Sequence, residues 1–529
     1  MFKALLRKQL MELKEVYTPR SRKSKKKTGT KGFVILFAVL TVSISFSFVG
    51  MSFLFADAFL PLGLDWVYFM MMAAIALVVS VVGSVFSAYS ILYSAKDNEF
   101  LMAMPIPPAT ILSVRLIAVF LSGFLFECMA LVPAIVVYAI RAGIKWYLLM
   151  QVFDLLWIGL LALVLTSLLG FLVGLVVARA RHKSLTTILI SVTLLALYYF
   201  VYFRLNSFLQ AIATNAAFIG ESVSGKAKPV MWVSQAFTGN LWGFLLLAGV
   251  SVVLMALTVL LLSRHFGKIA FTNKGIKKTA YVARPLHQKG VASALLRREF
   301  VRFFQTPAYV LNCGLGVLLS LALCVYAAVR FNFLKTGIES ILASLPPEWK
   351  DLAAFVPAVG VGFMGSMNVI TAPSISLEGN SLWLLKSMPI TSGQVFNAKQ
   401  GLHLYLNLPP VIITAALLSA LLGLTVWEGL INVVYGVCVV CFTSAMGLYM
   451  GLKKPMLDWT NETVPIKQSA SVAITMFGAW AMILAEAVAA YFLRNSFNLI
   501  PYLFILPLAL CVLLNRHLYT KGEKEFSDL

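Results

Sequence analysis

Two short stretches, KDNEFLMAMPI at residues 96–106 and NSLWLLKSMPI at residues 380–390, end in the same Met-Pro-Ile and lie between long apolar runs. Aligning the two copies pairs Leu101 with Leu385 and, further along, Arg115 with Lys399. A second match precedes each copy, because LLRKQL at residues 5–10 resembles LLRREF at residues 295–300. Two matches in the same order indicate an internal duplication.

The apolar runs around these stretches place the chain in a membrane. Of its 529 residues, 60% are hydrophobic and 12% charged, whereas a soluble domain is about 45–50% apolar and about 25% charged. Runs of roughly 20 apolar residues, enough for a helix to cross a hydrocarbon core of about 30 Å, recur along the chain, and the alternating segments of a transmembrane barrel are absent. We therefore expect an all-α polytopic membrane protein with about twelve spans. They are predicted near residues 33–55, 66–92, 111–139, 148–178, 185–203, 241–263, 308–329, 352–374, 394–424, 429–451, 468–492 and 497–515.

The duplication divides these spans into two pseudo-symmetric halves of six. We expect a first half at residues 1–263, a basic cytoplasmic linker at 264–293 and a second half at 294–529. Each half also contains a short amphipathic stretch between its second and third spans, at residues 96–105 and 380–389, which suits a helix lying flat beneath the bilayer. The proline at the end of each stretch stops the helix and allows the chain to turn into the next span.

The formal charge of +22 is gathered in a few clusters before or between apolar runs. Basic clusters beside spans follow the positive-inside rule and meet anionic lipid, so orientation explains the charge without nucleic acid. Residues 1–32, 178–184, 264–302, 452–455 and the tail from Arg516 are therefore expected in the cytoplasm, together with both termini. Arg141 and Lys145 fall on the outer side and fit this rule poorly.

Catalytic and metal-binding patterns are weak in this sequence. The six cysteines lie in apolar runs and predict no disulfide framework, and Cys438 and Cys441, although spaced C-x-x-C, are expected to be packing residues. The histidines show no metal-ligand spacing. GESVSGKA at residues 220–227 resembles a phosphate-binding loop but has Ala227 where a magnesium-binding Ser or Thr is needed, and it falls in a predicted outer loop. The long basic stretch before the first span argues against a cleavable signal peptide.

The order of a basic amphipathic segment, two spans, KDNEFLMAMPIPPATIL and four further spans resembles the permease of ATP-binding-cassette (ABC) exporters with ABCG-like, type V architecture, in the ABC type-2 permease class. The stretch GLKKPMLDWTNETVPIKQSASV at residues 451–472 resembles the cytoplasmic loop after the fourth span in Gram-positive members. The resemblance covers nearly the whole chain, and here both halves are fused in one polypeptide. It implies a connecting helix before each half, at residues 5–17 and 295–304, and the leucines of LLRKQLMELKE at helical spacing allow one.

The same resemblance implies that residues 96–105 and 380–389 are coupling helices that fit a groove of a separate ATPase. The docking residues implied are Asp97, Glu99, Phe100, Met104 and Pro105 in the first half, and Trp383, Lys386, Met388 and Pro389 in the second. The implied partners are two copies of an ABC ATPase, which would bind the ATP and magnesium, together with the lipid bilayer and an unidentified transported substrate. The chain itself is expected to bind no cofactor or metal, to be no enzyme and to reside in a bacterial plasma membrane. Because the two copies differ at most docking positions, equal engagement of two identical ATPases is in doubt.

Three acidic residues fall within predicted spans: Glu127, Asp154 and Glu486. Burying an ionisable side chain in the membrane costs about 2.5–3.5 kcal/mol on insertion scales, so such residues are either functional or paired inside the bundle. They leave open a second class of function, an ion-coupled secondary transporter, which can also have six plus six spans. A third class is a membrane scaffold that transports nothing.

Overall fold

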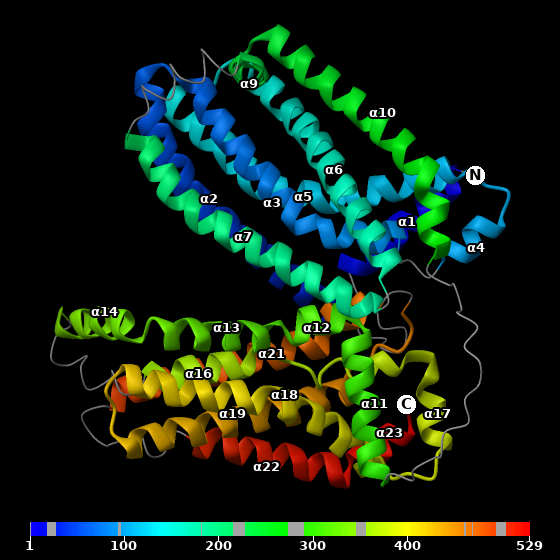
Figure 1. Cartoon of the computed structure of the whole chain (residues 1–529), viewed down its shortest axis with the longest axis vertical. Helices are drawn as coiled ribbons and strands as arrows, with labels where there is room; N and C mark the ends of the chain where they lie inside the picture. The colour runs from blue at the N-terminus through cyan, green and yellow to red at the C-terminus, as the bar shows by residue number, and fades with distance from the viewer. Residues whose placement is uncertain are drawn as a thin grey trace. The chain divides into compact units, whose positions relative to one another are not determined.

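The computed structural model describes residues 2–17, 28–93, 97–180, 182–214, 228–272, 290–344, 356–459, 462–467, 469–493 and 504–529. Over these residues the chain is helical and contains no strand. It divides into two compact units, Met1–Ala280 and Tyr281–Leu529, each with its own set of helices (Figure 1).

The first unit is a bundle of long helices with two short ones at its ends. Its helices are α1 (Phe2–Tyr17), α2 (Thr28–Phe59), α3 (Asp65–Tyr93), α4 (Asn98–Ala103), α5 (Pro108–Ala142), α6 (Leu148–Arg179), α7 (Lys183–Thr214), α9 (Lys228–Ser234) and α10 (Leu241–Thr272), with 3-10 turns η1 (Leu60–Leu62) and η2 (Gln235–Thr238). Within this unit α1 and α4 lie at one end of the bundle and α9 at the other (Figure 1).

The second unit has the same plan with more interruptions. Its helices are α11 (Val291–Gln305), α12 (Pro307–Cys313), α13 (Leu315–Val329), α14 (Phe331–Ser344), α16 (Val356–Ser366), α17 (Leu382–Ser387), α18 (Ser392–Leu421), α19 (Val426–Lys453), α20 (Thr463–Lys467), α21 (Ala470–Leu493), α22 (Ile505–Thr520) and α23 (Gly522–Ser527), with the 3-10 turn η3 (Ser376–Ser381) before α17. In this unit α11, α17 and α23 lie at one end and α14 at the other (Figure 1).

Each predicted span overlaps an apolar helix, although three of them overlap helices that are short or broken. Eight helices of the described chain are long and apolar enough to cross a membrane, and the bent pair α12 and α13 makes a ninth candidate. Helix α7, apolar over Lys183–Leu197, and the shorter apolar helices Val356–Ser366 and Ile505–Thr520 occupy the positions of the remaining predictions. The chain is therefore an all-helical polytopic membrane protein.

The first span of the second unit is broken rather than continuous. Helices α12 and α13 meet at 57° across Gly314. A Cβ at Gly314 would lie 2.5 Å from the ring of Phe303 and 3.0 Å from the carbonyl oxygen of Val310. The bend is therefore filled by the Phe303 ring of α11, which brings α11 directly against the start of this span.

The prediction of one continuous span at residues 352–374 is wrong. Helix α16 ends at Ser366, and the buried residues that follow form turns instead of helix. Side chains of the second unit satisfy the polar groups of this irregular segment: the Tyr309 hydroxyl donates to the carbonyl of Ile370 at 2.5 Å, and the Thr371 hydroxyl donates to the carbonyl of Ser444 at 2.9 Å. Buried non-helical backbone needs such protein partners, because its amide and carbonyl groups are removed from water.

Small residues bring the helices of the first unit close together. The sequence Gly170-x-x-x-Gly174 indicates close helix packing, and a Cβ at Gly170 would contact Ala88 and the backbone nitrogen of Tyr89 on α3 at 3.5 Å. The α3–α6 contact is thus backbone-to-backbone at this level.

The two basic residues that fit the positive-inside rule poorly have local partners. The guanidinium of Arg141 pairs with Asp57 at 2.9 Å, and the ammonium of Lys145 lies over the rings of Tyr138 and Tyr147. Both charges are therefore accommodated at the end of the first unit opposite α4.

Candidate functional site

The two Met-Pro-Ile segments occupy equivalent places in their units. Leu101 of α4 is 6% exposed and packs in an apolar cluster that includes Leu5 of α1. Leu385 of α17 is 2% exposed and packs in a cluster that includes Leu295 of α11. Because Leu5 matches Leu295 and Leu101 matches Leu385 in the internal alignment, the same pair of leucines shares an apolar cluster in each unit.

The opposite face of each short helix is uncovered. In the first unit Phe100 is 66% exposed and Met104 is 37% exposed, and in the second unit Trp383 is 65% and Met388 45% exposed. Pro105 and Pro389 are also exposed. The side chain of Glu99 lies outside the described part of the chain.

Two of the predicted docking residues are engaged within their own unit. Asp97 precedes α4 and pairs with basic side chains of α1 and α5. Lys386 donates from Nζ to the carbonyl oxygen of Ser527 at 3.0 Å, so the last residues of the chain contact α17. Neither group points freely outward.

Three charged residues behind α4 form what we call the first ion cluster: Lys8, Asp97 and Arg115. The carboxylate of Asp97 accepts from the ammonium of Lys8 and, at 2.8 Å, from the guanidinium of Arg115. Arg115 also donates to the carbonyls of Ile91 and Leu92 at 3.1 and 3.0 Å, near the end of α3. A cation suits this position, because the last carbonyls of a helix lack intrahelical partners. The first ion cluster therefore joins α1, the segment before α4, α5 and the end of α3.

Five charged residues form the second ion cluster behind α17: Arg298, Glu299, Arg302, Glu378 and Lys399. The carboxylate of Glu378 in η3 accepts from Arg298 at 2.6 Å, Arg302 at 2.7 Å and Lys399 at 2.9 Å. Lys399 also donates to Glu299 at 3.2 Å and to the carbonyl of Ser374 at 3.1 Å. The second ion cluster thus joins α11, η3 and α18.

The two clusters share one plan. In each unit, an acid just before the short helix binds two basic residues. One lies on the preceding amphipathic helix and is Lys8 or Arg298, and the other lies near the start of the third span and is Arg115 or Lys399. These four basic residues are paired by the internal sequence alignment. The acids are not, because Asp97 aligns with Ser381, and sequence reasoning missed Glu378. The signal available was that Glu378 is the one acid between the second and third spans of its half.

The charges around Glu378 change its acidity. Burial by itself opposes ionisation of this carboxyl, but Lys399, Arg302 and Arg298 outweigh burial and hold the pKa of Glu378 well below its usual range. An ionised carboxylate with three cationic partners is the stable form of this cluster.

The three intramembrane acids lie in two different environments. Glu127 on α5 and Asp154 on α6 are fully buried, and within the described part of the chain their carboxyl oxygens have no hydrogen-bond partner. Glu127 lies against Gly159 of α6, where an added Cβ would come within 2.8 Å of its Oε2. Glu486 differs, because it accepts a hydrogen bond from the Tyr435 hydroxyl at 2.6 Å.

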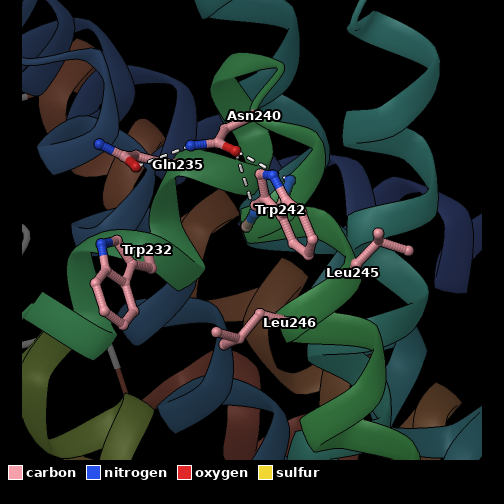
Figure 2. Close-up of a pocket in the computed structure, with 7 residues that line it drawn as sticks. Trp232, Gln235, Asn240, Trp242, Leu245 and Leu246 are labelled. Atoms are coloured by element: carbon pink, nitrogen blue, oxygen red, sulfur yellow. Dashed lines mark hydrogen bonds between the residues drawn. The ribbon is translucent and has the colours of Figure 1, made fainter.

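An open pocket of about 580 Å³ lies at the end of the first unit opposite α4, where α9, η2 and α10 meet (Figure 2). Its polar groups largely bind one another: the Asn240 amide donates to Gln235 at 3.1 Å, and its oxygen accepts the first amides of α10. The pocket therefore presents mainly the indole rings of Trp232 and Trp242 and the side chains of Leu245 and Leu246. Exposed tryptophans at the start of an apolar span are typical of a membrane–water boundary.

The remaining sequence candidates are the loop at residues 220–227 and the cysteines. Residues 220–227, which resemble a phosphate-binding loop, lie outside the described residues. The six cysteines are free thiols, and the described residues contain no group of three or more His, Cys, Asp or Glu side chains arranged for a metal.

Comparison with known proteins identifies the chain at the level of the membrane architecture. A search of curated proteins found no match, and neither did a search of solved structures. A family model described as a membrane protein of 12 TMs matches residues 33–515, from the first predicted span to the last. The chain therefore belongs to this family of twelve-span membrane proteins.

Proposed function

We propose that the chain is the membrane-spanning subunit of an ABC exporter, driven by a separate ATPase that binds at α4 and α17. One observation carries the proposal: each unit has a short helix with leucine buried on one face, its other face uncovered and a charged cluster behind it. A partner that binds the uncovered face and moves the short helix would also pull on the amphipathic helix and the next span of the same unit, because the charged cluster connects all three.

The uncovered side chains fit a protein partner better than lipid or water. Phe100, Trp383 and the two methionines are large and apolar, and aromatic residues and methionine are enriched in the buried cores of protein interfaces. The adjoining segments carry the basic clusters expected on the cytoplasmic side, where ATP is available. By resemblance to ABC exporters, closure of two ATPase subunits would move both short helices and open a path between the halves.

The experiment is to purify the chain from its native membrane, to ask whether an ABC ATPase copurifies, and to measure ATP hydrolysis with and without this subunit. Phe100→Asp and Trp383→Asp should each reduce the amount of bound ATPase several-fold. The matched control is Trp427→Asp, which changes a tryptophan of similar exposure, 67%, at the opposite end of the second unit. If no ATPase copurifies, or if all three variants bind it like the wild type, the proposal fails, and a membrane scaffold becomes the better description.

A second candidate, an ion-coupled transporter, rests on Glu127 and Asp154. Fully buried carboxyls without hydrogen-bond partners are rare, because an unpaired charge in an apolar interior is very costly. Under this alternative, Glu127→Gln and Asp154→Asn should abolish transport driven by a proton gradient. Under the leading proposal, these variants should leave ATP-dependent transport intact, so a vesicle transport assay with each energy source separates the two.

A further inference from the structure

We propose that the two coupling helices are mechanically unequal: the second ion cluster fixes α17 rigidly to α11 and α18, whereas the first lets α4 move relative to α1. The inequality is a property of this chain alone. Its consequence for transport rests on the function proposed above.

The two clusters differ first in how deeply their side chains are buried. The side chains of Glu378 and Lys399 are fully buried, whereas those of Asp97 and Lys8 are 29% and 38% exposed. Ion pairs in contact with water are screened by salt and exchange with solvent, while a buried ion pair loses heavily if one partner leaves. The Asp97–Lys8 pair can therefore open at little cost, and the Glu378–Lys399 pair cannot.

The two clusters also differ in the number of partners that each acid binds. Glu378 binds three cations, and Lys399 extends the network to Glu299 and to the backbone of Ser374. Asp97 binds two cations, and the one on α1 is the exposed Lys8. Displacing η3 would break several short hydrogen bonds at once, while displacing the segment before α4 relative to α1 breaks one exposed pair.

The backbone before α17 is also held in a constrained shape. Gly379 has φ of +51°, and an added Cβ would lie 3.1–3.2 Å from the indole of Trp459. That indole donates to the carbonyl of Ser376 at 2.7 Å, and the amide of Met456 donates to the hydroxyl of Ser376 at 3.0 Å. Residues 456–459, between α19 and α20, thereby fix η3 in place.

The end of the chain adds a further contact to α17. Phe526 of α23 is 4% exposed and packs in the same apolar cluster as Leu382 and Leu385, with its ring 5.7 Å from that of Phe396. Lys386 binds the carbonyl of Ser527. Helix α17 is thus held by α11, α18, α23 and the segment after α19.

The same displacement of α4 and of α17 would therefore be passed to the rest of each unit differently. The second unit would respond as one body, with α17, α11 and α18 moving together. In the first unit α4 would shift before α1 follows. We infer that motion between a coupling helix and its connecting helix is confined to the first half.

Hydrogen exchange of the purified full chain in detergent, without any ATPase, tests this inference. Backbone amides of residues 98–104 should exchange at least tenfold faster than those of residues 382–388. Raising the salt concentration should speed exchange in the first segment more than in the second, because Asp97 and Lys8 both meet water whereas Glu378 and Lys399 are fully buried. Equal rates, or equal acceleration by salt, would overturn the inference even if an ATPase binds.

Matched isosteric variants provide a second readout. Asp97→Asn should speed exchange in residues 98–104 alone, while Glu378→Gln should speed exchange in residues 382–388 and in α11 together. The double variant Lys8→Asp with Asp97→Lys exchanges the charges of this pair. It restores an ion pair between α1 and the segment before α4, but Arg115 then faces a lysine. Exchange in residues 98–104 should therefore return only part of the way to the wild-type rate. If Glu378→Gln does not fold, the salt comparison on the wild type still decides the matter. Failure to copurify an ATPase would sink the proposed function and leave this inference standing.

Discussion

At the scale of single residues, Glu378 joins three elements of the second unit. Its carboxylate lies where α11, η3 and α18 meet, and the three cations around it stabilise its ionised form. Removing one member of a buried ionic cluster leaves the others without a partner, which is typically more costly than the pairing itself is stabilising.

We expect Glu378→Gln to lower the free energy of unfolding by about 3–5 kcal/mol at pH 7. The matched control is Glu339→Gln on α14, where a carboxylate that is 62% exposed lies 4.0 Å from Lys335, and a change below about 0.5 kcal/mol is expected. Thermal unfolding in detergent measures both. A Glu378→Gln variant as stable as the control would contradict the rigid second cluster.

The difference in the free energy of unfolding between the wild type and Glu378→Gln should depend on pH with a definite sign. Because the three cations keep the pKa of Glu378 low in the folded state, its ionised form contributes stability above the unfolded-state pKa of about 4.3. Below that pH the unfolded chain takes up the proton first, so the contribution falls as the pH falls further. The stability gap between wild type and Glu378→Gln should be constant from pH 7 to about 5 and shrink in more acidic solution.

At the scale of elements, the broken span of the second unit shows how one small residue decides a helix path. Gly314 leaves room for the Phe303 ring at the junction of α12 and α13. The contact ties the bend in the membrane helix to α11, which also carries three members of the second ion cluster.

Gly314→Ala should therefore destabilise the protein, because the new Cβ would meet both the Phe303 ring and the carbonyl of Val310. A loss of about 1–3 kcal/mol is expected for overpacking of this kind. Gly337→Ala on α14 is the matched control, since nothing lies within 4 Å of its Cβ, and it should stabilise by up to about 1 kcal/mol. Melting temperatures of the two variants give the comparison, and equal shifts would show that the bend does not depend on Gly314.

At the scale of the whole molecule, the two units repeat one arrangement with different reinforcement. Each has an amphipathic helix, two spans or their equivalents, a short exposed helix and four further apolar helices. The first unit keeps these elements continuous. The second breaks its first span, replaces the end of its second span by buried turns and places α23 against the short helix.

The orientation predicted from charge can be tested on the full chain. Met104→Cys and Met388→Cys should react with a membrane-impermeant maleimide only after cells are opened, because both positions are expected in the cytoplasm. Ile144→Cys and Trp427→Cys, exposed at the opposite ends of their units, should react in intact cells. The parent chain with its native cysteines measures the background. Labelling of Met104→Cys in intact cells would invert the topology and remove the short helices from any cytoplasmic ATPase.

The sequence by itself determined the membrane class, the positions of the apolar spans and the repeated Leu101–Leu385 and Arg115–Lys399 correspondences. These depend on hydrophobic run length and on local patterns that one stretch of chain contains. Only the tertiary structure decided the break at Gly314, the turns after Ser366 and the choice of Glu378 as the partner of Lys399. Each of these depends on a group supplied from a distant part of the chain: the Phe303 ring, the side chains of Tyr309 and Thr371, and the guanidinium groups of α11. Local hydropathy cannot contain such information, because the energy of a buried polar group is set by partners that only the folded chain brings together.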